Sequence, residues 1–470
     1  MRPEPPSSGE RNLCGRRGRS LLFRPSAVVA LSLALLAPTA VIAATPTVDP
    51  APLEAPPPSA DSRITIADAA AMTIAHHPDV ARAFAALARG EADLGAARSV
   101  WAPQLSYRAN LGPNMFSGDS GSGLNNNMAG PTLALQQRLW DFGRSKGEIG
   151  YAASTERQRR FEVEAVADLL AERGAIGFLE VKRFELLAEE TLKHVQSLER
   201  LRGLIGLRVD AGISDKSDLL LADVRVQSAK GEESRARSAL TVAKATLANL
   251  IGGMPERYDD PAPLIAAFAV REDDPDYASL PAIAAAEQAE AAAAARIEQA
   301  RAERYPRVNL ELGYSRNNYS YSTNDDNFTA MITVTGDLYR RGNRYAVRAA
   351  EQERRAARAA KETAELDARG RALAAREEIA GGRQRIEVYR AQEQQARLAS
   401  RIFFEEYKLG KRSLTDLLNA ELEIYRAASA RIAAEYDILT ARVRYETVHG
   451  KLRPSFGLPP TLIEEDPDGG

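Results

Sequence analysis

The side chains best suited to chemistry are few in this chain, and they do not form a catalytic or metal site. His76 and His77 stand directly before Pro78, a position that predicts a polar helix end. The acidic segment 273–276 lies in a proline-rich stretch and predicts a solvated loop. One Cys and four His among 470 residues provide neither a zinc-ligand spacing nor a disulfide framework. We therefore expect no enzyme, no metal and no cofactor.

Charge and composition exclude a second class of function and indicate which elements carry the rest. The chain has 62 basic and 64 acidic residues, a formal charge of −2, and so lacks the basic surplus that nucleic-acid binding requires. It is 44% apolar but only 6% aromatic. Long stretches of Ala, Glu, Arg and Leu are typical of long, exposed helices. Helices must therefore position most functional side chains.

The first 61 residues are expected to hold an export signal followed by a linker. A positive region at Arg16 to Arg24, an apolar run at Ala27 to Ala37 and small residues up to Ala44 predict a signal peptide over residues 1–44. The apolar run is too short to span a bilayer as a helix. The only cysteine, Cys14, would leave with this segment. Residues 45–61, rich in proline and alanine, predict a flexible linker.

Proline is absent from two long stretches, between Pro131 and Pro255 and between Pro306 and Pro454. Because proline inside a helix costs about 3 kcal/mol, such gaps favour uninterrupted helices. At about 1.5 Å per residue, one helix over residues 143–208 would be roughly 100 Å long. Helices of this length must pack side by side, as in a coiled coil or a tube.

An internal repeat organises the chain. Pro78 and Pro103 are 25 residues apart, as are Pro281 and Pro306. Other landmarks recur at nearly the same offset: Leu139 to Gly143 with Leu338 to Gly342, and Gly212 and Asp218 with Gly410 and Asp416. The mature chain is therefore expected to use one unit twice. We predict a first unit over residues 62–254, a connector over 255–277, a second unit over 278–453 and a tail over 454–470.

Each unit is expected to hold a helix, two strands and two long helices in that order. Apolar and polar residues alternate in segments 104–111, 132–139, 307–314 and 328–335, which predicts four strands. Segments 114–130 and 316–327, rich in Gly, Asn, Ser and Asp, predict surface loops. A soluble sheet with one wet face is one interpretation. The polar residues on the second face instead resemble the lumen side of a transmembrane barrel.

A membrane location would require several copies of the chain. No run of 18 apolar residues follows the predicted signal peptide, so no spanning helix is expected. A lipid-exposed sheet edge would leave backbone groups unsatisfied, and four strands are too few to close a barrel. Several protomers would therefore contribute strands to one barrel, in a cyclic oligomer around the pore.

From Ile64 to Leu452 the chain resembles the TolC family of outer-membrane factors. The paired units, the segment Trp140 to Arg144 and the two helix-hairpin turns carry the likeness. The resemblance implies a mostly α membrane protein of the α+β class. The resemblance also implies a homotrimer whose twelve-stranded barrel, four strands per protomer, crosses the outer membrane and continues into a long α-helical tunnel through the periplasm. Such channels contact outer-membrane lipid, dock onto an inner-membrane ABC or proton-driven transporter through a periplasmic adaptor, and export drugs, toxic compounds or proteins.

The resemblance also implies a gate at the periplasmic end of the tunnel. By position, Tyr407 and Arg412 match gate residues of the inner helix pair, and Asp218, beside Ser217, matches their acidic partner. A charge-assisted Arg–Asp bond near water is weak enough for a docking partner to break. The plain alternative is an acid placed in the first turn of a helix, where it favours the helix dipole.

The pore constriction departs partly from the family pattern. Asp416 matches one of two acidic rings that narrow the family's pore, whereas Asn419 stands where the second acid is found. Three copies of Asp416 would still favour cations. Because the second acidic ring is missing, the sequence does not decide whether cations block the pore strongly. The resemblance further implies that the tips of the two hairpin turns contact the adaptor. The need for a glycine in a tight turn explains the glycines at these tips equally well. The tip residues are Gly212, Ile213, Gly410 and Lys411.

Two questions stay open at the level of sequence. Drug efflux and type I protein secretion are both compatible with the chain, although Trp140 to Arg144 resembles members that serve type I secretion. The alternative to a channel is a periplasmic coiled-coil protein with a structural or adaptor role. The four alternating strands argue against that alternative.

Overall fold

The computed structural model describes residues 63–113, 127–268, 276–317 and 325–463. All of them belong to one compact unit, Val48–Gly470. The predicted signal peptide and linker, residues 1–61, lie outside the described residues, as do residues 273–275 of the acidic segment and most of both predicted strand-connecting loops.

The main elements run through the chain twice in the same order, which confirms the internal duplication. The first set is α2 (Pro78–Arg98), β2 (Gln104–Pro113), β3 (Asn127–Trp140), α3 (Arg144–Asp210) and α4 (Lys216–Ile251). The second set is α6 (Pro281–Ala302), β5 (Arg307–Asn317), β6 (Asp325–Thr335), α7 (Asn343–Lys408) and α8 (Leu414–Val448). Shorter elements complete the fold: β1 (Arg63–Ile64), α1 (Ile66–His76), η1 (Ser99–Trp101), β4 (Arg257–Tyr258), α5 (Ala262–Ala266), η2 (Tyr277–Ser279) and α9 (Leu452–Ser455).

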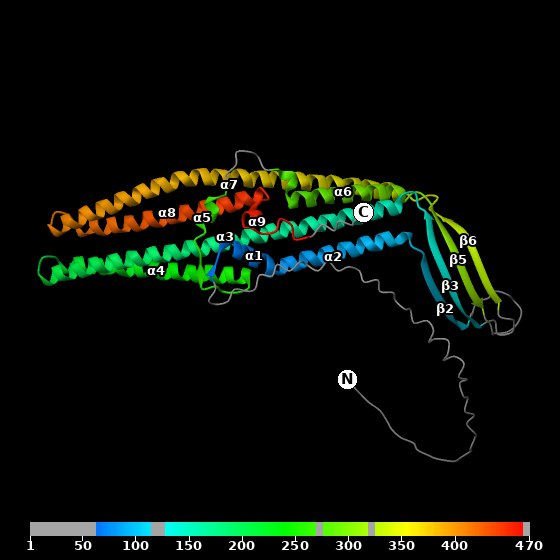
Figure 1. Cartoon of the computed structure of the whole chain (residues 1–470), viewed down its shortest axis with the longest axis horizontal. Coiled ribbons are helices and arrows are strands. Elements are labelled where there is room, and N and C mark those ends of the chain that lie inside the picture. The colour runs from blue at the N-terminus through cyan, green and yellow to red at the C-terminus, as the bar shows by residue number, and fades with distance from the viewer. Residues whose placement is uncertain (1–62, 114–126, 269–275, 318–324, 464–470) are drawn as a thin grey trace, which may run out of the picture. The chain divides into compact units, whose positions relative to one another are not determined.

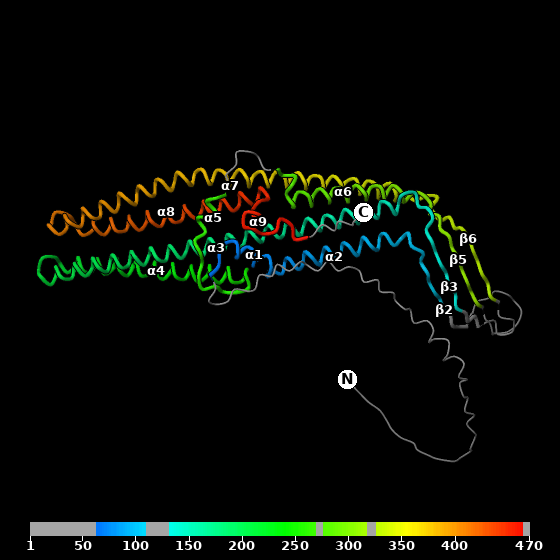
Figure 2. The backbone as a smooth tube through the Cα atoms, viewed as in Figure 1, coloured from blue at the N-terminus to red at the C-terminus, as the bar shows by residue number. Residues whose placement is uncertain are grey.

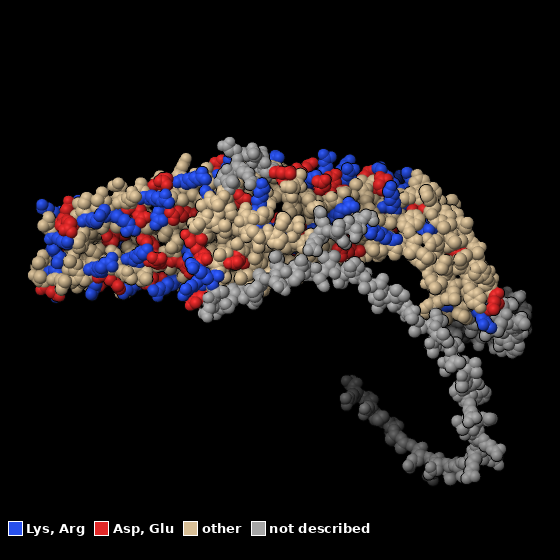
Figure 3. Space-filling model, viewed as in Figure 1, with Lys and Arg blue, Asp and Glu red and all other residues tan. Residues whose placement is uncertain are grey.

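The proline-free stretches form the long helices that the sequence predicts. α3 has 67 residues and α7 has 66, and each would be about 100 Å long as a straight helix. α4 packs on α3, α3 on α8, and α8 on α7, so the two hairpins form a row of four helices (Figures 1 and 2). Nearer the strands, α2 and α6 pack on α3, and α6 also packs on α7. Charges of both signs cover the helices on the face shown in Figure 3, whereas the strands carry few.

The strands form one antiparallel sheet in the order β2-β3-β5-β6. Its register aligns apolar side chains in rows: Leu105 with Leu135, Leu135 with Leu312, and Leu312 with Ala330. Polar residues share the other parity, so the predicted alternation is confirmed. The predicted loops were too long, since strand pairing continues to Pro113–Asn127 and Asn317–Asp325. The strands thus extend into residues whose composition is typical of loops.

Two segments carry more structure than the sequence suggested. The connector contains β4, which pairs in parallel with β1, and α5, whose Ile265 is fully buried. Arg442 of α8 donates from Nη1 to the Ile265 carbonyl at 3.0 Å, so the connector is docked on the helices. Ahead of α2 lies α1, which begins with a capping box between Thr65 and Asp68.

Apolar side chains pack in two main clusters along the helices. The central cluster surrounds Phe178 and joins α1, α3, α4, α5 and α8. The second cluster lies at the hairpin turns and includes Ile205, Val226, Tyr407 and Leu417. Among the described residues, none of the helices combines the length and the apolarity that crossing a bilayer requires.

Candidate functional site: the hairpin turns and the seam between them

The two hairpin turns have the same backbone geometry. Gly212 and Gly410 follow α3 and α7 with φ of +71° and +73°. In the first turn, Ile213 N donates to Arg208 O at 2.8 Å; in the second, Lys411 N donates to Glu406 O at 2.9 Å. Together with the bonds from both glycine N–H groups, these make two Schellman caps. The glycines are therefore required by the turn itself.

Tyr407 is buried at the end of α7, where it links the two hairpins. Its side chain is 5% exposed and belongs to the apolar cluster at the turns. The Arg208 guanidinium of α3 lies over its ring at 5.0 Å, and Arg208 Nη1 donates to the Lys408 carbonyl at 3.3 Å. The Tyr407 hydroxyl is buried without a hydrogen-bond partner among the described residues.

Arg412 makes its polar contacts within its own hairpin. Its Nε lies 2.9 Å from Glu406 Oε2, and its Nη1 lies 3.9 Å from Asp416 Oδ2. Its guanidinium also lies over the Phe403 ring at 4.2 Å. Asp416 lies in the first turn of α8, where its N–H donates to Ser413 Oγ at 3.1 Å. Its place at the start of the helix brings its carboxylate close to Arg412.

The predicted acidic partner lies on the other hairpin and is not joined to Arg412 within this protomer. Asp218 is half-buried in the first turn of α4, and Ser217 before it is exposed. Among the described residues, no ion pair connects Arg412 with Asp218. The structure thus brings Arg412 and Asp416 together and leaves Asp218 on the neighbouring hairpin. Asn419 is exposed on α8, three residues beyond Asp416.

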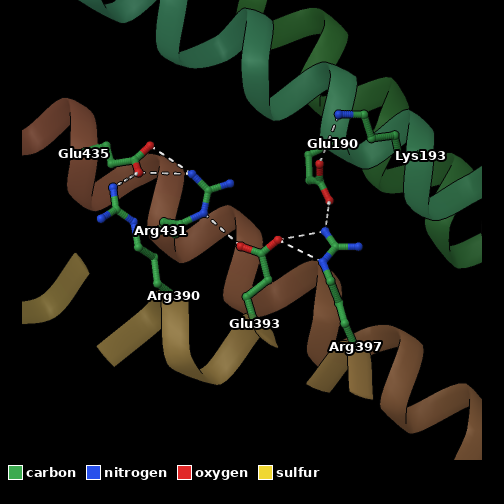
Figure 4. A network of polar contacts seen from close by, with 7 residues as sticks. All are labelled: Glu190, Lys193, Arg390, Glu393, Arg397, Arg431 and Glu435. Carbon is green, nitrogen blue, oxygen red and sulfur yellow. Dashed lines mark hydrogen bonds and ion pairs between the residues drawn. The ribbon is translucent and has the colours of Figure 1, made fainter. Parts of the chain in front are cut away.

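Away from the turns, a polar network joins α3 to the second hairpin (Figure 4). Glu393 of α7 is its centre: it accepts from Arg397 at 2.7 Å and from Arg431 at 2.8 Å. Arg397 also lies 3.7 Å from Glu190 of α3, which carries the network across to the first hairpin. We call this set the polar seam; it comprises Glu190, Lys193, Arg390, Glu393, Arg397, Arg431 and Glu435.

Beside the polar seam, a histidine is enclosed between the hairpins. The His194 ring of α3 stacks on the Tyr425 ring of α8, with centroids 4.7 Å apart and planes 11° apart. Burial lowers the pKa of His194, although the carboxylates of Glu232, Glu421 and Glu190 act in the opposite direction. Glu421 accepts from Ser197 at 2.7 Å and Ser400 at 2.5 Å, so it too bridges α3, α7 and α8.

The segment Trp140 to Arg144 forms the junction between strand and helix. Asp141 is buried and accepts from the Ser145 N–H at 2.8 Å, while Arg138 lies 3.6 Å from its carboxylate. These contacts satisfy donors at the start of α3. Phe142 adopts a left-handed φ of 55° and stacks on Tyr305, with ring centroids 5.2 Å apart.

Sequence reasoning missed Arg208, the residue that joins Tyr407 to the first hairpin. The repeat itself held a signal for it, because Arg208 and Glu406 occupy equivalent positions of the two turns and carry opposite charges. The polar helix end predicted at the histidines is confirmed: His77 is the N-cap of α2 and its Nδ1 accepts from Asp79 N at 3.2 Å.

Comparisons with known proteins identify the family and the relatives of this chain. The family described as outer membrane efflux protein matches residues 70–253 and 278–451, one match in each half of the chain. Protein CyaE of Bordetella pertussis is 27% identical over 278 residues, which are 56% of this chain and 57% of CyaE. The chain's match thus spans little more than half of that relative's length.

Solved structures show the same fold. VceC, an outer membrane protein of Vibrio cholerae, aligns with a TM-score of 0.72 and 18% identity over 82% of this chain and 96% of VceC. The open state of the MtrE outer membrane channel of Neisseria gonorrhoeae aligns with a TM-score of 0.68 and 19% identity, over 85% and 91% of the two chains. A membrane protein from Pseudomonas aeruginosa aligns with a TM-score of 0.75 and 20% identity, over 82% and 92%.

The family match confirms three predictions: a TolC-like chain, an outer-membrane location reaching into the periplasm, and the lack of an enzymatic role. It covers most of both repeated units, from α1 to the end of α4 and from η2 to the end of α8. The chain belongs to the outer membrane efflux protein family.

Proposed function

We propose that three copies of this chain form an outer-membrane channel that serves as the exit duct of a tripartite export system. The observation that carries the proposal is the sheet. Its apolar side chains are aligned on one face, and β2 and β6 each pair on one side only within the described residues. Such edges need further strands if lipid is to cover the apolar face.

The number of copies follows from the resemblance to TolC-like channels, in which twelve strands close the barrel. Three sheets of four strands provide that number. The row of four helices in each protomer would supply one third of the tunnel wall, with α4 and α7 at its two edges. In the proposed trimer, the sheet edges β2 and β6 and the helix edges α4 and α7 therefore contact the same neighbouring subunits.

The gate is proposed at Tyr407, Arg412, Asp218 and Ser217. Tyr407 has a buried hydroxyl for which the described residues offer no acceptor, and Arg412 is half-buried at the same end of the second hairpin. In a closed trimer, Asp218 or Ser217 of an adjacent first hairpin would complete these groups. Because Arg412 already pairs with Glu406 and Asp416, the additional contact would be easily exchanged when a partner docks.

The constriction is proposed at Asp416 and Asn419, with one acidic ring in place of two. The adaptor is proposed to bind the exposed hairpin turns, where Ile213 offers an apolar side chain and Lys411 a cation. The turn geometry alone requires Gly212 and Gly410, so these glycines are no evidence for an adaptor. Adaptor binding is therefore tested at Ile213 and Lys411.

The experiment that tests the proposed function is export from cells that lack this chain. If the chain serves type I protein secretion, cells that lack it should no longer release the secreted protein into the medium. If it serves multidrug efflux, such cells should become more sensitive to drugs. Photo-crosslinking from position 213 should capture a periplasmic adaptor, whereas position 242 on the exposed side of α4 serves as control. Unchanged export with no crosslink at position 213 would overturn the proposal.

The alternative of a periplasmic spacer or adaptor receives no support from the family match. It predicts a protein released without detergent, whereas the channel predicts extraction from the outer membrane as a heat-sensitive oligomer. A soluble monomer would contradict the channel.

A further inference from the structure

The exposed aromatic side chains of this protein gather at the strands. Among the described residues, each of them lies on a strand or within ten residues of a strand end. Both tryptophans of the chain are included. These residues are Trp101, Tyr107, Trp140, Phe142, Tyr305, Phe328, Tyr339 and Tyr345. Trp and Tyr favour the level at which a membrane meets water, so those at the junction of strands and helices, Trp101, Trp140, Tyr305 and Tyr339, mark where the bilayer ends.

The chain that leads from β6 into α7 adds cations to this aromatic zone. The twelve residues from Asp337 onward contain four arginines and one acid. Asp337 lies 3.6 Å from Arg340, and Arg341 is exposed beside it. Arg344 donates to the Tyr345 hydroxyl at 2.9 Å, and its guanidinium lies 4.7 Å from the centre of that ring. The segment therefore presents a surplus of positive charge.

The end of α6 lies at the same level and contributes to the same surface. Gly336 packs directly on Pro306, where an added Cβ would lie 2.9 Å from the proline Cα. Next to Pro306, the Arg304 guanidinium lies over the Tyr305 ring at 5.0 Å. We call this surface the basic aromatic band, formed by Arg304, Tyr305, Tyr339, Arg340, Arg341 and Arg344.

The repeat shows that these arginines are not demanded by the fold. Arg340 and Arg341 occupy the positions that Asp141 and Phe142 hold in the first unit. There, the Asp141 carboxylate is buried and bonded to the start of α3. In the second unit two exposed cations precede a helix, where positive charge is disfavoured by the helix dipole. An external anion accounts for them better than packing does.

We propose that the basic aromatic band binds the phosphate groups of anionic phospholipids in the periplasmic leaflet of the outer membrane. The occupant is a lipid surface because the band is continuous with the apolar face of the sheet, which the outer-membrane location places against lipid tails. Tyr339, 85% exposed, would lie among the headgroups, while the arginines meet the phosphates. The inference rests on the membrane location of the family and is independent of the gate and of the exported cargo.

The test measures lipid preference around the full-length protein reconstituted in vesicles. Spin-labelled phosphatidylglycerol and phosphatidylcholine are compared by the fraction that the protein immobilises. We expect phosphatidylglycerol to be favoured at least about fivefold, the effect of one surface arginine. The preference should fall towards equality in 0.5 M NaCl, because salt screens exposed charges.

The variant Arg340→Gln/Arg341→Gln/Arg344→Gln removes three of the four arginines of the band and should lower the preference severalfold. The matched control, Arg376→Gln/Arg383→Gln/Arg401→Gln, removes the same charge from exposed positions farther along α7 and should keep it. Equal association of the two lipids with the unaltered protein, or a preference retained in the band variant, would overturn the proposal. So would a band variant that no longer forms the oligomer but keeps its lipid preference, because the band would then be a subunit contact.

If the triple variant does not insert, Arg341→Gln and the salt series on the unaltered protein decide the question. A preference that is insensitive to salt contradicts the proposal. Ion conductance recorded from the same preparations reports on the channel separately, so a failure of the lipid proposal is distinguishable from a failure of the proposed function.

Discussion

Arg453 is a buried cation held by two carboxylates of α3. Its Nη2 lies 2.7 Å from Glu164 and its Nε 2.6 Å from Asp168, and the whole residue is 3% exposed. The other Glu164 oxygen accepts the backbone N–H of Leu462 at 2.7 Å. Burial raises the pKa of Asp168 even though Arg453 counteracts it. This group therefore ties the C-terminal segment to the first unit.

We predict that Arg453→Met destabilises the folded protein by about 3–5 kcal/mol, because it leaves two enclosed carboxylates without a cation. The measurement is the free energy of unfolding in denaturant, with Arg383→Met, an exposed arginine of α7, as control. Equal stability of the two variants would contradict the assignment.

His194 should make the fold sensitive to mild acid. Burial holds its pKa in the folded protein below the ordinary value of 6.5, so the unfolded chain binds its proton first. Between those two pKa values the unfolded state holds more protons, and stability therefore falls as the pH drops below about 6.5. We predict that the loss of stability between pH 7.5 and 5.5 is smaller in His194→Gln than in His449→Gln. An identical pH profile in both variants would remove the role given to His194.

At this scale the sequence predicts local geometry and not distant partners. The cap at His77 and the turn glycines Gly212 and Gly410 follow from neighbouring residues. The pair formed by Arg453 and Glu164 joins positions 289 residues apart, and no spacing rule indicates such a contact.

At the scale of elements, the polar seam is one of the charged connections between the two hairpins, beside the ion pair of Arg183 on α3 with Asp437 on α8 at 3.2 Å. Burial alone would raise the pKa of Glu393, but hydrogen bonds and charges from Arg431 and Arg397 hold it below its usual value. A carboxyl with a lowered pKa stabilises the fold above its unfolded pKa, near 4.5, and this stabilisation is lost as the pH falls through the folded value.

We predict that Glu393→Gln destabilises the packing of α7 on α8, and through Arg397 the packing on Glu190 of α3, by about 1 kcal/mol, because its partner Arg397 is half-exposed. Hydrogen exchange should become faster in α7 around residues 390–404 and in the facing part of α3. The control is Glu387→Gln, a 74% exposed carboxyl of the same helix that pairs with Arg390. Unchanged exchange in α3 would mean that the polar seam does not connect the hairpins.

The elements themselves could be predicted to different degrees. Proline-free stretches indicated α3 and α7 because a break there would be costly, and period-two alternation indicated the strands. The connector was harder, because β4 has two residues and owes its existence to pairing with β1, almost 200 positions earlier. The predicted loops between the strands were too long because turn-forming residues also occur in the last strand residues.

At the scale of the whole molecule, the sequence predicted a duplicated, mostly helical protomer with four strands, and the fold confirms this. The trimer, the closed barrel, the gate and the adaptor contacts stay proposals, because each needs surfaces of other chains. Their common basis is the two edges of the sheet, β2 and β6, and the two edges of the helix row, α4 and α7, each of which lacks a further strand or hairpin neighbour among the described residues.

Single-channel recording of the purified protein in planar lipid bilayers tests the central claim most directly. We expect stepwise ion conductance from the unaltered oligomer, and larger steps from Tyr407→Phe with Arg412→Ser, because these changes weaken the closed end. Arg401→Ser, an exposed arginine on the same hairpin, should leave the steps unchanged. An intact oligomer that inserts into the bilayer and passes no current, with or without the gate changes, would show that the protein is not a channel.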